Sequence, residues 1–125
     1  MENVAKETRQ ALVTALTNAG LNPRTTPPKN SFDEYVFIGE NSPFIESSEQ
    51  VYGVNVHYEL LAFPKASLDP VEQVKRADVL TGKIMAALWE TMEITCEGYS
   101  TITGADEKPR TVARFNVTLT YQQGD

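Results

Sequence analysis

The chain has 125 residues, of which 41% are hydrophobic and 22% charged, a composition typical of one ordinary globular domain. Its 17 acidic and 11 basic residues give a formal net charge of −6, and no basic cluster is longer than Lys75 and Arg76. Because nucleic-acid binding relies largely on Lys and Arg that neutralise phosphates, we expect no specific binding of nucleic acid. No apolar run approaches the roughly 20 residues of a membrane span, so we expect no membrane contact.

Short features of the sequence bear on secretion and on the redox state of the compartment. The first ten residues lack the apolar core of a signal peptide, which predicts that the protein is not secreted. Cys96 is the only cysteine, which excludes an internal disulfide and suits a reducing compartment. We therefore expect synthesis in the cytosol.

Residues 3–19 are predicted to form an amphipathic helix. Its apolar face consists of small and aliphatic residues at helical spacing: Val4, Thr8, Ala11, Leu12, Ala15, Leu16 and Ala19. Gly20 follows where a left-handed cap is favoured, and Pro23 prevents the helix from continuing. Residues 22–31 contain three prolines and no periodicity, which predicts an extended connector.

Two strands are predicted next. Residues 35–38 form a short apolar run that ends at Gly39, as expected of a strand with both faces covered. Residues 40–50 are polar apart from Phe44 and Ile45, which predicts a loop whose apolar pair either folds inward or faces a partner. Residues 51–63 alternate between apolar and polar side chains over most of their length, which indicates a long strand with one apolar and one polar face.

The clearest helix start in the chain is at Asp69. This residue is a favourable N-cap, Pro70 suits the first helical position, and Glu72 can complete the capping pattern. The predicted helix runs to about residue 91, with a broad stripe facing the core: Val71, Val74, Ala77, Leu80, Thr81, Ile84, Met85, Leu88 and Trp89. Gly82 interrupts this helix and is expected to mark a close backbone contact.

Two more strands are predicted at the C-terminal end. Residues 93–102 have a β-rich composition with a pattern shift at Gly98 that indicates a bulge, and residues 103–110 form a charged hairpin loop. Residues 111–121 alternate cleanly, and residues 122–125 are a polar tail. The order helix, strand, strand, helix, strand, strand predicts a single α+β domain over residues 1–125, with a four-stranded, mostly antiparallel sheet and both helices on one face. The uncovered face would carry polar residues: Asn55, His57, Glu59, Arg114, Asn116, Thr118 and Thr120.

No residue pattern indicates catalysis. His57 is the only histidine, and its strand neighbours Asn55 and Glu59 do not complete a nucleophilic system around it. One His and one Cys do not make a typical zinc site, and the acidic residues lack calcium-loop spacing. Acidic residues in predicted loops, such as Glu46, are expected to be solvated. We therefore expect no enzyme activity, no metal and no cofactor.

Several local sequences occur in an order typical of one family. The first helix closes with LTNAGL at residues 16–21, and a Pro-rich connector leads into YVFIGE at residues 35–40. The long alternating strand and the Asp69-capped helix follow, this helix closes with AALW at residues 86–89, and an alternating strand ends the chain. In these features, over nearly its full length, the chain resembles the tail terminator (tail completion) proteins of long-tailed bacteriophages.

The resemblance implies a structural role in the virion. Proteins of this family assemble, typically as hexameric rings, on the finished tail tube, stop its polymerisation and present a surface to a head-side connector protein. Genomic DNA passes through the ring without specific binding, which agrees with the acidic chain. The implied location is the tail or neck of the virion, after assembly in the host cytoplasm. Two alternatives stay open: a neck or head-closure protein of the same virion, and a small cellular ligand-binding α+β domain.

The resemblance carries no functional motif that assigns roles residue by residue. We expect contacts with neighbouring subunits or with the tube in the connector and in the loops at 40–50 and 103–110. The candidate interface residues are Arg24, Lys29, Phe44, Ile45, Asp106, Glu107 and Lys108.

Overall fold

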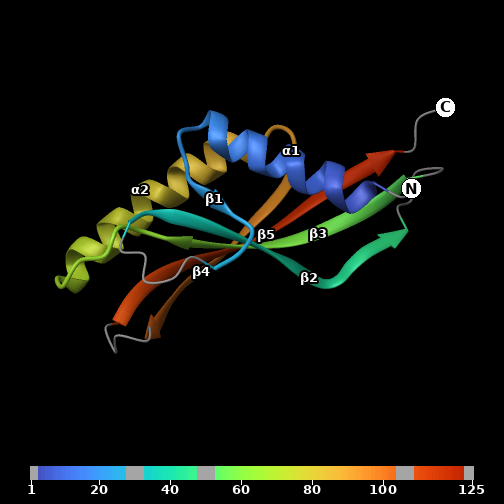
Figure 1. Ribbon diagram of the computed structural model, residues 1–125. Coiled ribbons are helices and arrows are strands. Elements are labelled where there is room, and N and C mark those ends of the chain that lie inside the picture. The colour runs from blue at the N-terminus through green and yellow to red at the C-terminus, as the bar shows by residue number, and fades with distance from the viewer. Residues whose placement is uncertain (1–2, 28–32, 48–52, 104–108, 123–125) are drawn as a thin grey trace.

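In the part of the chain that the structure describes, two helices lie on one face of a twisted β-sheet (Figure 1). The computed structural model describes residues 3–27, 33–47, 53–103 and 109–122. In chain order the elements are α1 (Val4–Asn18), β1 (Pro23–Arg24), β2 (Tyr35–Ser47), β3 (Gly53–Phe63), α2 (Pro70–Leu88), β4 (Glu93–Thr103) and β5 (Pro109–Gln122). The strand order in the sheet is β1-β2-β3-β5-β4. All neighbouring strands are antiparallel except β1 and β2, which are parallel.

The α+β class is confirmed, but the predicted four-stranded sheet is wrong, because the sheet has five strands and is mixed. The additional strand is β1, which lies in the predicted connector. Pro23 and Arg24 pair with Val36 and Phe37, and the Asn22 carbonyl accepts a hydrogen bond from the Val36 N–H at 2.9 Å. A proline fits at this edge because its missing N–H is not needed for pairing. Two residues are too few to show strand periodicity in the sequence.

The prediction of a loop beginning at residue 40 is also wrong, because β2 continues to Ser47. Ile45, Glu46 and Ser47 pair with β3, and the register shifts between Glu40 and Ile45. Pro43 lies within this shift, where it cannot donate a ladder hydrogen bond. Because of this interruption, the alternation typical of a strand cannot be recognised in the sequence. Residues 48–50 of the predicted loop lie outside the described residues.

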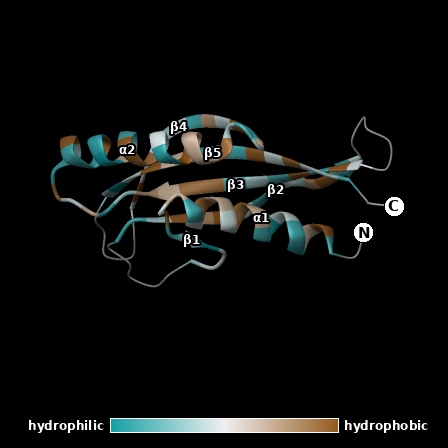
Figure 2. Ribbon diagram, turned by 90° about the horizontal axis from the view of Figure 1, so that it is seen from above, coloured by the Kyte–Doolittle hydropathy of each residue, from teal (hydrophilic) through white to brown (hydrophobic). Residues whose placement is uncertain are grey.

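The main core lies between the sheet and the two helices. Figure 2 shows α2 near β4 and β5, with α1 near β1 and β2. The alternation predicted for β3 is confirmed, since Val56, Tyr58 and Leu60 are fully buried on the helix side. The helices contribute their own fully buried residues to the same core: Leu12, Leu16, Leu80, Ile84 and Leu88. Neither α1 nor α2, the helices of the described residues, has the length and hydropathy of a membrane span.

Helix α2 begins as predicted, and four residues of the predicted stripe are fully buried: Ala77, Leu80, Ile84 and Leu88. The Asp69 side chain accepts a hydrogen bond from the Val71 N–H at 3.0 Å, and Pro70 opens the helix. Val71 and Trp89, predicted to face the core, are exposed instead, whereas Gln73 is buried. Burial of Gln73 is possible because its amide bonds backbone groups: Nε2 donates to the Ser67 carbonyl at 2.6 Å, and Oε1 accepts from the Thr111 N–H at 2.7 Å.

Two predictions about glycines have different outcomes. The bulge at Gly98 is confirmed by a register shift between Cys96 and Gly98 and by a φ of 108°. The close contact at Gly82 is wrong, because a Cβ there would meet no atom within 4 Å. The bounds of the hairpin loop predicted at 103–110 are wrong, since Thr103 belongs to β4 and Pro109 to β5, and residues 104–108 lie outside the described residues.

Candidate functional site

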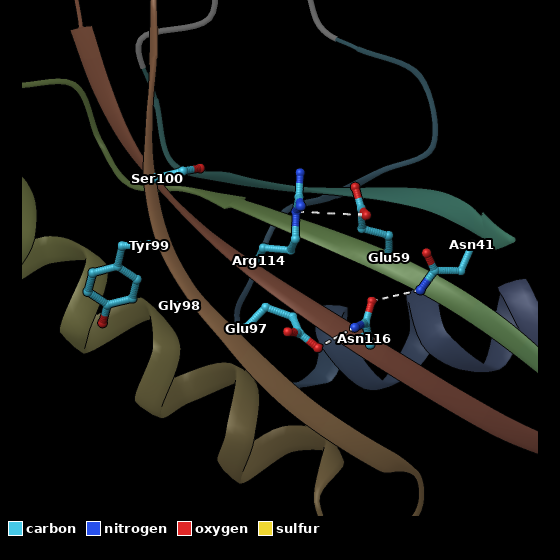
Figure 3. Close-up of a pocket in the computed structure, with 8 residues that line it drawn as sticks. All are labelled: Asn41, Glu59, Glu97, Gly98, Tyr99, Ser100, Arg114 and Asn116. Atoms are coloured by element: carbon cyan, nitrogen blue, oxygen red, sulfur yellow. Dashed lines mark hydrogen bonds and ion pairs between the residues drawn. The ribbon is translucent and has the colours of Figure 1, made fainter.

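The sheet face opposite the helices, called the uncovered face from here on, is lined by side chains that alternate with the core residues. It contains an open hollow of about 450 Å³ (Figure 3). The hollow draws residues from β2, β3, β4 and β5: Asn41, Glu59, Glu97, Gly98, Tyr99, Ser100, Arg114 and Asn116. It lies beside the bulge at Gly98, where the pairing of β4 with β5 shifts register.

The polar side chains of the hollow bind one another across strands. Asn41 Nδ2 donates to Asn116 Oδ1 at 2.7 Å, and Asn116 Nδ2 donates to Glu97 Oε1 (Figure 3). Arg114 Nε lies 3.8 Å from Glu59 Oε2, and the Arg114 side chain is 55% exposed. An ion pair this exposed contributes at most about 1 kcal/mol. The hollow is therefore an open, hydrogen-bonded polar surface that contains two carboxylates and one guanidinium.

His57 lies beside a second hollow of about 360 Å³, which shares Asn41 and Asn116 with the first. The His57 ring joins three strands: Nδ1 is 2.8 Å from Thr118 Oγ1 on β5, and Nε2 is 2.6 Å from Glu46 Oε1 on β2. His57 thus has hydrogen-bond partners on β2 and β5 in addition to its strand neighbours Asn55 and Glu59. Sequence reasoning missed Glu46 because it placed that residue in a solvated loop and not in a strand.

The Thr118 hydroxyl, the His57 ring and the Glu46 carboxylate lie in the order of a nucleophile, a base and an acid that orients the base. A carboxylate only accepts, so with a neutral ring Nε2–H donates to Glu46 and the Thr118 hydroxyl donates to Nδ1. Acyl transfer also requires donors aimed at a developing oxyanion. The nearby amides of Asn41 and Asn116 donate instead to Asn116 and Glu97. The arrangement serves best as a cross-strand tie between β2, β3 and β5.

Toward the start of β2, the side chains of the uncovered face become mostly apolar. Its aromatic end consists of half-buried and buried apolar residues: Tyr35, Phe37, Leu61 and Phe63. The rings of Tyr35 and Phe63 stack at 4.5 Å, and the Arg110 guanidinium lies 5.5 Å and 5.4 Å from their centroids. Burial raises the pKa of the Tyr35 hydroxyl above its usual value, and Arg110 partly offsets the effect. The face therefore has an aromatic end and a polar end.

The candidate interface residues are not gathered at one place. Arg24 is exposed and pairs with Phe37 near the start of β2, whereas Ile45 is exposed near the end of β2. Phe44 is partly buried, with its ring edge-on to Tyr58 at 5.3 Å, so of the pair it is the residue that packs inward. The remaining candidates lie outside the described residues: Lys29, Asp106, Glu107 and Lys108.

Among the described residues, no group of three or more His, Cys, Asp and Glu side chains is placed to hold a metal ion. Comparison of the sequence with protein-family models and with curated proteins finds no match to either.

Proposed function

We propose that this chain is a structural subunit of a long-tailed phage virion and acts as a tail terminator. Several copies form a ring on the finished tail tube, stop its polymerisation and present a surface to the head-side connector protein. The resemblance of the sequence supports the choice of this assembly. The exposed apolar surface of α2 supports assembly itself.

The apolar surface of α2 is the observation that carries the proposal. Eight large apolar residues are exposed among those described, and five of them belong to α2 or its two ends: Leu68, Val71, Val74, Val79 and Trp89. An apolar surface gathered on one element of a small domain usually marks a protein contact. A subunit that acts only within an assembly requires such a surface.

Charge and the polar face agree with a structural role. The formal net charge of −6 disfavours tight binding to DNA that passes through a ring. The His57 side chain ties strands of the uncovered face together by bonding both Glu46 and Thr118. We propose no reaction at this face.

Tail length in virus particles tests the proposal. A phage lacking this gene should produce tails of excessive and variable length, measured by electron microscopy, because polymerisation has no stop. Tails of normal length that fail to join heads would contradict termination and favour a neck or head-closure protein.

A second candidate function is binding of a small polar ligand, favoured by the hollow of about 450 Å³ on the uncovered face. Small-molecule sites are usually enclosed and mostly apolar, whereas this hollow is open and polar. A monomeric protein whose thermal stability rises with a small polar molecule would favour this second candidate.

A further inference from the structure

Strand β4 forms one outer edge of the sheet, and its last five residues, 99–103, are called the open segment from here on. The strand order ends at β4, so in the described part of the chain only β5 pairs with it. All five residues of the open segment are exposed, and its two large side chains, Tyr99 and Ile102, are 40% and 38% exposed. A strand at a sheet edge presents backbone N–H and C=O groups that another strand can bind.

Other parts of the two outer edges carry features that oppose strand addition. At the opposite edge, β1 covers the start of β2, and Pro43 lies farther along β2. The first half of β4 carries Glu93 and Glu97 and ends in the register shift before Gly98. Charged side chains, prolines, bulges and short covering strands all hinder pairing between edges. The open segment, with the sequence YSTIT, has none of these features and consists mostly of β-branched and aromatic residues, which favour strands.

The open segment is held in place before any partner binds. It pairs with β5 residue by residue, from Tyr99 opposite Ala113 to Thr103 opposite Pro109. The Tyr99 side chain points toward α2 (Figure 3), where its hydroxyl donates to Asp78 Oδ1 at 2.6 Å. A strand that is already ordered loses little conformational freedom on pairing, which favours association.

The open segment matches a second copy of itself in an antiparallel register centred on Thr101. In that register Tyr99 lies opposite Thr103, and Thr101 lies opposite Thr101 of the second copy. Ser100 and Ile102 form the remaining pair. An aromatic residue opposite a β-branched one and two opposed threonines are both favourable cross-strand pairs. Because the paired residues include no charged side chain, the segment meets no repulsion from its own copy.

Registers that use the first half of β4 fit less well. An antiparallel pair centred on Thr95 places Glu93 of each copy opposite Glu97 of the other, and a pair centred on Glu97 places that carboxylate opposite itself. Like charges directly opposed destabilise a strand pair. The register shift before Gly98 also disrupts the regular spacing of backbone groups there. Pairing is therefore favoured only at the open segment.

We propose that two copies of this chain pair through the open segment of β4, in antiparallel orientation about a two-fold axis at Thr101. Backbone groups of each segment donate to and accept from the other, and the two sheets join into one. Such a contact uses the same surface on both copies and closes at two. It goes beyond the proposed function, because a ring on a tail tube needs a separate head-to-tail contact, whereas this pair forms in the free protein.

Sedimentation over a range of protein concentrations tests this pairing. We expect the wild-type protein to dissociate from dimer to monomer on dilution. Thr101→Lys should raise the dissociation constant by more than about tenfold, because it places two ammonium groups opposite each other at the two-fold axis. Thr95→Lys is the matched control, since Thr95 is an exposed threonine of the same strand outside the open segment. It should leave the dissociation constant unchanged, and both variants should keep the wild-type circular dichroism spectrum.

Disulfide formation provides a second measurement if the introduced lysine impairs folding. In a Cys96→Ser background, Thr101→Cys should give a covalent dimer when oxidised glutathione is added. The Cα atoms of residues opposed across an antiparallel pair lie about 4.5–5.5 Å apart, within the range that a disulfide spans. Thr95→Cys in the same background should stay monomeric on a denaturing gel.

Three results would overturn the inference. The first is a wild-type protein that is monomeric at every concentration, and the second is an unchanged dissociation constant in Thr101→Lys together with no covalent dimer of Thr101→Cys. The third is a dimer that Thr95→Lys weakens as much as Thr101→Lys does, because the contact would then extend beyond the open segment. A dimer that responds as expected, in a protein that never caps tail tubes, would support the inference and contradict the proposed function.

Discussion

At the scale of single residues, the uncovered face is organised by side-chain bonds that cross neighbouring strands. His57 connects Glu46 on β2 with Thr118 on β5, and Asn116 connects Asn41 with Glu97. Each bond spans at least two strands, so these groups stabilise the relative placement of the strands at the surface. Their partial exposure limits the energy of each bond.

The His57 and Glu46 pair should contribute modestly to stability. We expect the coupling energy in a double-mutant cycle with His57→Ala and Glu46→Gln to be about 0.2–1 kcal/mol, because the two side chains are 21% and 50% exposed. Urea denaturation measures the four free energies of unfolding. The His57→Ala protein should remain folded and assemble, and a folded variant that fails to terminate tails would assign a function to this face.

Tyr58 should make the protein sensitive to alkali. Its side chain is fully buried, and its hydroxyl shares a hydrogen bond with Thr8 at 2.8 Å and donates to the Ala5 carbonyl at 3.1 Å. Burial is the main reason that the pKa of the Tyr58 hydroxyl lies above its usual value of 10.0. The folded state therefore retains a proton that the unfolded state releases. The resulting stability is complete below pH about 10 and is lost as the pH rises through the folded pKa.

The variant Tyr58→Phe isolates this effect. It should lower the free energy of unfolding by about 1 kcal/mol at neutral pH, because the hydrogen bonds are lost. Above pH about 10 its stability should decline less steeply than that of the wild type. Some decline should remain, since burial also raises the pKa of Tyr35. Parallel curves of stability against pH for the two proteins would contradict the assigned cause.

At the scale of elements, the sequence predicts best what depends on neighbouring residues. The N-cap at Asp69 and the alternation in β3 are local and were predicted correctly. Strand β1 and the far end of β2 depend on pairing with distant residues, and Pro43 interrupts the pattern, so neither could be read from periodicity. The polar residues of the uncovered face were predicted from alternation, but the bond from His57 to Glu46 was not, because it requires the extended β2.

The edges of the buried face of α2 show a similar limit. Val71 and Trp89 share the apolar character of core residues, whereas Gln73 becomes buried only because distant backbone groups bind its amide. The backbone partners of Gln73 are not visible in the sequence of the helix. The stripe of apolar residues therefore predicted the helix and the centre of its buried face correctly, but the edges of that face incorrectly.

Adjacent positions at the end of α2 test its orientation. Leu88→Ala should lower the free energy of unfolding by about 2–5 kcal/mol, because Leu88 is fully buried and its truncation leaves a cavity. Trp89→Ala, one residue along, should change the stability of the monomer by less than about 0.5 kcal/mol. Chemical denaturation at low protein concentration measures both, and the reverse order of effects would show that the helix face is misassigned.

Two glycines should respond in opposite directions to the same substitution. Gly98→Ala should destabilise the protein by about 1–2 kcal/mol, since its φ of 108° strains any side-chain-bearing residue. Gly82→Ala should stabilise the monomer by up to about 1 kcal/mol, because Gly82 lies within α2 and an added Cβ meets no atom within 4 Å. Thermal denaturation compares them, and destabilisation by Gly82→Ala would indicate a contact absent from this fold.

At the scale of the whole molecule, the two layers give the chain two unlike surfaces. The helix layer presents exposed apolar residues of α2 bordered by charges of both signs, and the sheet presents a face that is aromatic at one end and polar at the other. Unlike surfaces on opposite sides favour head-to-tail contacts, which build rings or filaments. This organisation relates the fold to the proposed role at the end of a tail tube.

The most direct test of that role is electron microscopy of the purified protein mixed with growing tail tubes of the same phage. We predict a ring of this chain at one end of each tube, together with a halt in elongation at that end. Tubes that continue to lengthen without a bound ring, in the presence of a protein that stays monomeric, would contradict the account.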